Sequence, residues 1–302
     1  MSDLTSEQQG KILQSHMFVV KKRDGVTKAR MVAGGNLQRG HVTKEESSSP
    51  TVSTELVLLT SIVDAQEGRE VAVIDIPNVF IQTRVQDAKD RVIIRITGVI
   101  VDWLVKAAPK VYASYVATNK RGEKSLLVEC YNAIYGTMVA GLLYYRKFTS
   151  SLKKRGFVMN PYDPCVWNKT IKGKQLTICF HVDDCKISHV MVRVVDYTIE
   201  WLQEEYESIF TDGTGKMKVA RGKVHTYVGM TLDFTTSIVK VTMFEYIDEI
   251  VQAWDKACSE LKDEYKVVSG HKRIALQHPT ICLKLMKMLC NLTKQRPSHS
   301  TT

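Results

Sequence analysis

Two adjacent aspartates, Asp183 and Asp184, interrupt the apolar segment Leu176–Ser188 (LTICFHVDDCKIS). Adjacent carboxylates repel each other and aspartate is disfavoured in strands, so a buried hairpin normally avoids such a pair. A bound divalent cation would offset the repulsion, because hard cations such as Mg²⁺ take oxygen ligands. The alternative is a strained turn whose carboxylates are satisfied by ordinary contacts. The pair is therefore the first candidate for a chemical role.

A third carboxylate, Asp75, ends another apolar run in Glu70–Pro77 (EVAVIDIP). Both segments have the composition of β-strands. Three carboxylates on two strands are the minimum for a site that holds two metal ions and transfers phosphoryl groups. The pattern is compatible with such a site, provided that the fold brings the two strands together.

The elements that must position these residues can be predicted from hydrophobic periodicity and turn signals. We expect hairpins over Met17–Val32, within Ala88–Thr118 and around the double aspartate, a strand over Val71–Ile76, helices over Glu55–Gln66, Val139–Lys154, Val190–Phe210, Phe244–Cys258 and His278–Leu292, and strand-like structure over Val224–Met243. This order predicts an α+β fold with helices packed on one face of a sheet.

The chain of 302 residues carries a net charge of +10. Its basic residues recur in clusters along the chain, which favours an extended polyanion such as a nucleic acid over a single anion pocket. The alternative is that these clusters are solvated faces. No apolar run is long enough to span a membrane, and the N-terminus has no signal-peptide core. We therefore expect no membrane association and no secretion.

Four sequence blocks occur in a fixed order: Lys28–Ala33 (KARMVA), Ile74–Phe80 (IDIPNVF), Ala133–Gly136 (AIYG) and His181–Asp184 (HVDD). They resemble the reverse transcriptase of copia-type long-terminal-repeat retrotransposons, whose blocks read KARLVA, DVxxAF, ALYGL and YVDD. Two later segments, Tyr227–Leu232 (YVGMTL) and Tyr246–Ile247, resemble further blocks of the same family.

The resemblance implies a right-hand polymerase fold with fingers, palm and a partial thumb, in which an antiparallel palm sheet is backed by helices. It implies a disordered or extended N-terminus over residues 1–16 and fingers and palm over 17–235. Residues 236–302 would form a helical thumb or connection-like region, truncated before ribonuclease H. The chain would be a fragment of a longer polyprotein that also carries ribonuclease H and integrase.

By resemblance the chain is an RNA-directed DNA polymerase that transfers a nucleotide from a dNTP to a primer 3′-hydroxyl on an RNA or DNA template. Asp75, Asp183 and Asp184 would be the catalytic residues and would hold two Mg²⁺ ions, for which Mn²⁺ is a possible substitute. One ion lowers the pKa of the primer hydroxyl, and the other binds the triphosphate and the leaving pyrophosphate. The expected location is a cytoplasmic virus-like particle, the nucleus, or both.

The resemblance also assigns residues around the reaction. Nucleotide binding falls to Lys22, Arg30, Phe80 and His181, and primer positioning to Tyr227, Val228, Gly229 and Met230. The Phe80 ring would exclude a ribonucleotide 2′-hydroxyl, and the alternative for Phe80 is core packing. The planar fork of an arginine suits a triphosphate, and the alternative for Lys22 and Arg30 is that they are solvated charges of the hairpin.

Several residues depart from the family pattern. Val139 replaces a glutamine that helps to seat template and nucleotide, and Leu142 stands where many relatives have arginine. Asn78 and Val79 replace small residues, so that Val79 is expected to add bulk beside the nucleotide. These departures favour an alternative, a degenerate fragment that is weakly active or inactive and only binds nucleic acid. A further alternative is a truncated product that folds poorly without its missing C-terminal partner.

Overall fold

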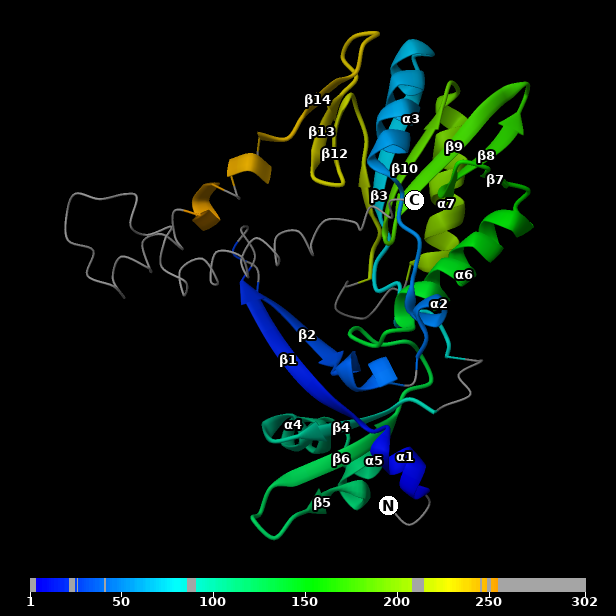
Figure 1. The fold of residues 1–302 in the computed structure, drawn as a ribbon. Helices are drawn as coiled ribbons and strands as arrows, with labels where there is room; N and C mark the ends of the chain where they lie inside the picture. The colour runs from blue at the N-terminus through cyan, green and yellow to red at the C-terminus, as the bar shows by residue number, and fades with distance from the viewer. Residues whose placement is uncertain are drawn as a thin grey trace, which may run out of the picture. The chain divides into compact units, whose positions relative to one another are not determined.

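The structure is a computed structural model that describes residues 4–21, 25, 27–40, 42–85, 91–207, 215–244, 246–248 and 251–254. Two compact units share the chain (Figure 1): unit 1 comprises Met1–Pro50, Ile76–Val158 and Glu200–Lys218, and unit 2 comprises Thr51–Asp75, Met159–Ile199 and Val219–Thr302. Lys22, the helix predicted over His278–Leu292 and most of the predicted thumb region lie outside the described residues.

Unit 1 is built on a five-stranded sheet with the order β2-β1-β4-β6-β5. Its strands are β1 (Leu13–Lys21), β2 (Thr27–Ala33), β4 (Ile93–Thr97), β5 (Ala117–Thr118) and β6 (Lys124–Glu129). The antiparallel β1–β2 pair confirms the predicted basic hairpin. It begins earlier than expected, and a short helix, α1 (Ser6–Gly10), precedes it with a capping box from Thr5.

The core of unit 1 surrounds β4. Its buried members are Leu13, Ala33, Val92, Ile94, Ile96, Val101 and Leu126. The hairpin predicted within Ala88–Thr118 is wrong in its middle, where the chain forms α4 (Val99–Ala107), α5 (Pro109–Tyr112) and a 3₁₀ turn, η2 (Ala113–Tyr115). Gly98 has φ 70° and lets the chain turn out of β4 into α4, whose residue Val101 is completely buried. Tertiary packing therefore outweighed the β-like composition of this segment.

A long helix of unit 1, α6 (Ala140–Lys154), matches the helix predicted over Val139–Lys154. Its buried side chains Leu142, Phe148 and Leu152 recur at helical spacing. Gly156, with φ 82°, ends the helix in the left-handed conformation that glycine adopts without steric cost. The two other helical segments near the N-terminus are short, η1 (Gly35–Gly40) and α2 (Lys44–Ser47).

Unit 2 contains a six-stranded sheet with the order β11-β3-β10-β9-β8-β7. Its strands are β3 (Glu70–Asp75), β7 (Val158–Asn160), β8 (Asp163–Ile171), β9 (Lys174–His181), β10 (Asp184–His189) and β11 (Lys218–Ala220). Strands β3, β10, β9 and β8 pair antiparallel with one another in that order. The apolar runs of β9 and β10 are buried almost throughout, as expected of central strands.

Helix α3 (Thr54–Gln66) lies along this sheet (Figure 1) and confirms the helix predicted over Glu55–Gln66. Ser53 caps its N-terminus by accepting a hydrogen bond from the Leu56 amide at 3.3 Å. Helix α7 (Val192–Tyr206) confirms the second long helix; it begins in unit 2 and ends in unit 1. A small sheet of unit 2 consists of β12 (Val224–Tyr227), β13 (Met230–Asp233) and β14 (Lys240–Thr242).

The predicted α+β class is therefore confirmed; the central strands of unit 2 are antiparallel, whereas the sheet of unit 1 is mixed, because β1 and β4 pair parallel. No helix in the described part of the chain is both long and apolar enough to cross a bilayer.

Candidate active site

The register of unit 2 brings two of the predicted carboxylates together. Asp75 is the last residue of β3 and Asp184 is the first residue of β10, and the two residues are direct cross-strand partners. Side chains in such positions have Cβ atoms about 4.5–5.5 Å apart. On the other side of β10, Asp184 is opposite His181, the last residue of β9. Three of the predicted site residues thus lie side by side at one end of three adjacent strands.

Asp183 lies in the two-residue turn that joins β9 to β10. Its neighbour in this turn, Val182, has φ 58°. A positive φ is an outlier for a β-branched residue, and strained backbone of this kind is found disproportionately at functional sites. Asp183 is partly buried, like Asp75 and Asp184. The tight turn therefore holds the third carboxylate next to the cross-strand pair.

Burial and neighbouring charges both act on the acidic group formed by Asp75, Asp183 and Asp184. Burial, followed by the charges of Asp183 and Asp75, raises the pKa of Asp184 to about 6. The charges of Asp183 and Asp75 thus disfavour the ionised form of Asp184, which is the imbalance that a cation would offset. The described residues contain no group of three or more His, Cys, Asp or Glu side chains already close enough to hold a metal ion. The fit to a cation therefore rests on the oxygen donors and on the repulsion among them.

A buried ion pair joins strand β10 to helix α3, and sequence reasoning missed it. The ammonium of Lys186 on β10 pairs with the carboxylate of Asp64 on α3, and their side chains are 1% and 0% exposed. Arg69 approaches the other carboxylate oxygen of Asp64 at 3.7 Å. The only sequence signal was a lysine within an apolar strand. The pair fixes β10 to α3 two residues after Asp184.

The segment predicted to position the primer is the hairpin β12–β13. Its turn residues, Val228 and Gly229, have φ 50° and 74°, the combination of a type I′ turn. Tyr227 and Met230 flank the turn and are only 2% and 4% exposed. The Tyr227 hydroxyl donates to the carbonyl of Cys179 on β9 at 2.9 Å, and burial raises the pKa of this hydroxyl well above its ordinary value.

This hydrogen bond ties the hairpin to the strand that carries His181. Buried Tyr227 and Met230 are therefore anchors, and the residues of this segment left to meet a primer are Val228 and Gly229. Contact with a primer stays a prediction.

A second group of predicted residues meets within unit 1. The Phe80 ring packs edge-on against the Tyr135 ring, with centroids 4.8 Å apart, and against Tyr144 at 6.4 Å. The Arg30 guanidinium carbon lies 5.7 Å from the centroid of the Tyr135 ring. Arg30 is otherwise exposed on β2. Three sequence blocks thus contribute one side chain each to an aromatic and basic cluster, which is a cation–π arrangement.

Close backbone contact explains the Tyr135–Gly136 block. The Ala33 amide donates to the Tyr135 carbonyl at 2.8 Å. A Cβ atom on Gly136 would lie 2.2 Å from the Ala33 carbonyl oxygen, and one on Gly35 would lie 2.0 Å from the Gly136 carbonyl oxygen. Gly136 also has φ 90°. Only glycine fits these two positions, so this block ties the N-terminal hairpin to the segment before α6.

The structure gives a physical reason for some of the residues that depart from the family pattern. Asn78 has φ 53°, a conformation that asparagine tolerates better than most residues. The expectation that Val79 adds bulk beside the nucleotide is wrong, because its side chain is 1% exposed and belongs to the core. Leu142 is 8% exposed on α6 and packs inward. Val139 occupies the N-cap position of α6 without a side-chain capping bond.

Comparisons with known proteins bear on the identity of the chain. Residues 4–265 match the sequence profile of the family described as reverse transcriptase (RNA-dependent DNA polymerase). No curated protein is similar enough in sequence to count as a match.

Solved structures similar to the chain include a telomerase from Candida albicans in complex with a fragment of telomeric RNA (TM-score 0.38, 10% identity, 79% of this chain and 48% of that chain). Another is an apo telomerase from Candida tropicalis truncated from its C-terminal domain (TM-score 0.36, 12% identity, 78% of this chain and 55% of that chain). The chain spans about half the length of these proteins. Both TM-scores are below 0.5, so the assignment rests on the family match. The chain belongs to the reverse transcriptase (RNA-dependent DNA polymerase) family.

Proposed function

We propose that the chain is the polymerase part of a copia-type retrotransposon polyprotein, which adds dNTPs to the 3′-hydroxyl of a DNA primer on an RNA or DNA template. The family match supports RNA-directed DNA synthesis as the class of reaction. The observation that carries the proposal is the register that pairs Asp184 with Asp75, next to a turn that presents Asp183.

Asp75, Asp183 and Asp184 are the residues that would hold two Mg²⁺ ions, or Mn²⁺ in their place. When bound, the metal ions supply an activated primer hydroxyl and neutralise charge on the triphosphate and the leaving pyrophosphate. Asp184 must be ionised to act as a ligand. Its pKa of about 6 makes it a carboxylate at neutral pH and increasingly a protonated acid below pH 6.

Other residues have proposed roles in substrate binding. The Arg30 guanidinium can donate paired hydrogen bonds to phosphate oxygens of the dNTP, as a planar fork does. Phe80, held edge-on by Tyr135, has a fixed ring of the kind that sugar selection requires. Lys22 would add a second cation for the triphosphate, and His181 a ring beside the acidic group. Ribonuclease H and integrase segments of the polyprotein, and action in cytoplasmic particles and the nucleus, belong to the same proposal.

The test is primer extension on an RNA template with dNTPs and Mg²⁺ or Mn²⁺. The wild-type chain is expected to extend the primer, and Asp183→Asn and Asp75→Asn are expected to abolish extension while still binding the primer–template duplex. Asp102→Asn is a matched control, because Asp102 is an exposed carboxylate on α4 that pairs with Lys124. Extension by Asp183→Asn at the wild-type rate would refute the metal assignment.

A second candidate function is nucleic-acid binding without catalysis. Val139 and Leu142 favour it, because neither can make the hydrogen bonds of the glutamine and arginine that relatives carry. It predicts salt-sensitive duplex binding, since neutralised phosphates release counterions, without primer extension by the wild type. Restoration of extension by Val139→Gln would then locate the defect. A cooperative thermal transition of the wild type would count against a chain that folds poorly.

A further inference from the structure

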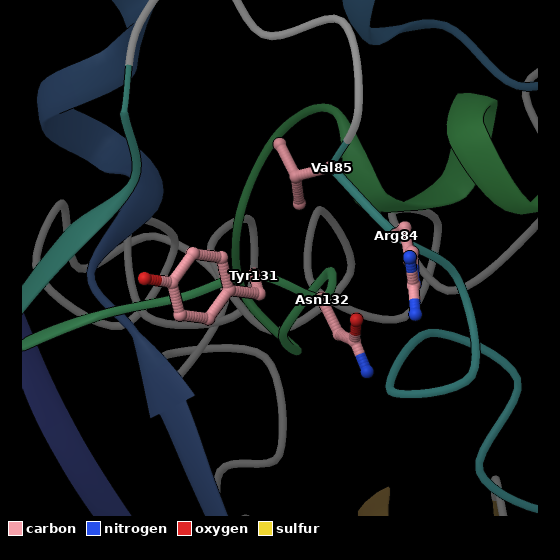
Figure 2. A pocket seen from close by; sticks show the side chains of 4 residues that line it. All are labelled: Arg84, Val85, Tyr131 and Asn132. Atoms are coloured by element: carbon pink, nitrogen blue, oxygen red, sulfur yellow. The ribbon is translucent and has the colours of Figure 1, made fainter.

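A cavity of about 590 Å³ lies in unit 1, between the segment after Phe80 and the segment before Ala133. The described residues that line it are Arg84, Val85, Tyr131 and Asn132 (Figure 2). Backbone contacts hold the two segments together: the Val85 amide donates to the Tyr131 carbonyl at 2.9 Å, and the Ala133 amide donates to the Thr83 carbonyl at 2.7 Å. Arg84 and Asn132 form an isolated antiparallel bridge. The walls of the cavity are therefore preformed.

The side chains of this cavity combine a ring, a cation and an amide. Tyr131 is 77% exposed, so most of its ring is accessible to a ligand. Arg84 is exposed and has no ion pair or hydrogen bond through its side chain to any described residue. Figure 2 shows the polar ends of Arg84 and Asn132 on one side of the cavity and the Tyr131 ring on the other, with the tyrosine hydroxyl directed away from them.

Nearby charges leave the cation of this cavity unneutralised among the described residues. Glu129, close in sequence to Tyr131, is already bound by Arg91, whose Nε donates to the carboxylate at 2.8 Å. This hydrogen bond lowers the pKa of Glu129 below its ordinary value, so Glu129 is a committed partner of Arg91. Within the part of the chain that the structure describes, Arg84 thus has no carboxylate partner, and the chain as a whole has a net charge of +10. An anionic group is the natural ligand.

Aromatic rings and arginines side by side are the means by which proteins bind single-stranded nucleic acid: a base stacks on the ring and the backbone phosphate meets the cation. The volume lies within the range of about 300–1,000 Å³ typical of small-ligand sites. Bases of a duplex are stacked on one another and cannot stack on Tyr131. The cavity therefore suits an unpaired nucleotide.

We propose that this cavity binds one unpaired nucleotide of a single-stranded nucleic acid, with the base stacked on Tyr131, its phosphate on Arg84, and Asn132 hydrogen-bonded to the base or sugar. In the proposed polymerase this strand is unpaired template. The inference rests on the proposed function for the role of the strand, and its test needs binding alone.

The experiment measures fluorescence anisotropy of a labelled single-stranded RNA of about 12 nucleotides, a length within the usual site sizes, with the full chain. Tyr131→Leu is expected to weaken binding about 5- to 150-fold, the loss of one stacked base. Tyr131→Phe keeps the ring and is expected to retain wild-type affinity. Arg84→Gln is expected to weaken binding and to reduce the salt dependence of log K by about 0.7, the value for one phosphate on a single strand.

Two matched controls separate the cavity from general surface effects. Tyr162→Leu removes a tyrosine that is 87% exposed in unit 2, and Arg121→Gln removes an exposed arginine elsewhere in unit 1. Both are expected to bind the strand more tightly than Tyr131→Leu and Arg84→Gln do. Equal losses in the control variants, or unchanged binding by Tyr131→Leu, would overturn the inference, as would a wild-type chain that does not bind the strand.

Two further arms identify the ligand. A blunt RNA duplex is expected to bind the wild type and Tyr131→Leu equally, and a free dNTP is expected not to displace the strand from the cavity. If Tyr131→Leu weakened the binding of a free dNTP but not the binding of the strand, the inference would be overturned. If the chain does not extend a primer but its strand binding depends on Tyr131, the proposed polymerase function is refuted and the proposed nucleotide site is supported. If the chain extends a primer but its strand binding does not depend on Tyr131, the polymerase function is supported and the nucleotide site is refuted.

Discussion

The substitution Asp64→Asn is expected to destabilise unit 2 strongly. Asp64 is completely buried and its carboxylate faces two cations, Lys186 in an ion pair and Arg69 at 3.7 Å. Removing one partner of a buried pair leaves an uncompensated charge, which costs about 3–5 kcal/mol. Native domains are stable by about 5–15 kcal/mol, so the loss is a large part of the total.

The neighbouring residues predict that substitutions of Asp64 and of Lys186 destabilise unit 2 by different amounts. In Lys186→Met, Asp64 still has Arg69 nearby, so this variant should be less destabilised than Asp64→Asn. Arg69 has other partners, since its Nε donates to Glu67 at 2.9 Å and its terminal nitrogen donates to Thr177 at 3.1 Å. Lys186 has no second carboxylate of this kind among the described residues. The buried ammonium of Lys186 is therefore the main source of the penalty in Asp64→Asn.

The assay is urea denaturation followed by tryptophan fluorescence, to which Trp167, buried on β8, contributes. The double variant Asp64→Asn, Lys186→Met should recover about 1–3 kcal/mol relative to the sum of the single variants, which is the coupling of residues in contact. Glu67→Gln is the matched control, because Glu67 pairs with Arg69 but is 45% exposed, and exposed pairs contribute about 0–1 kcal/mol. A cost of Asp64→Asn no larger than that of Glu67→Gln would refute the reasoning.

Two further predictions concern the acidic group and the glycine contact. Because the folded-state pKa of Asp184 is raised to about 6 from 3.8, the metal-free folded state binds a proton more tightly than the unfolded chain, so this residue reduces stability as pH rises from about 4 to about 6. Asp184→Asn should therefore raise the melting temperature of the metal-free chain at pH 7.5 but not at pH 3.5, and added Mg²⁺ should stabilise the wild type more than this variant. Calorimetry at both pH values, with and without Mg²⁺, measures these melting temperatures. Equal melting temperatures of the wild type and the variant at pH 7.5 without Mg²⁺ would contradict the prediction. Gly136→Ala should lower the melting temperature by several degrees because its Cβ would meet the Ala33 carbonyl oxygen at 2.2 Å, whereas Gly122→Ala, which meets no atom within 4 Å although its φ is also positive, should lower it less.

Much of the candidate site was predictable because its residues follow local rules. Asp75 ends one apolar strand and Asp184 begins another, helix α3 has its capping serine in the sequence, and helix α6 has its periodic apolar residues. Val182 with positive φ could not be predicted, since nothing local favours a β-branched residue there. The helix α4 was missed because its apolar residues suit a strand equally well, and only packing around Val101 decides between them.

By itself, the sequence determined the family and the α+β class and singled out three carboxylates as candidates for the site, because ordered motifs, hydrophobic periodicity and turn residues are properties of short segments. Only the tertiary structure decided that Asp184 is opposite Asp75, that Asp64 is the buried partner of Lys186, and that Arg84 and Tyr131 share a cavity. These pairings join segments far apart in the chain. A strand's pattern specifies which face is buried but not which strand is its neighbour, so the partners are settled only when the whole sheet forms.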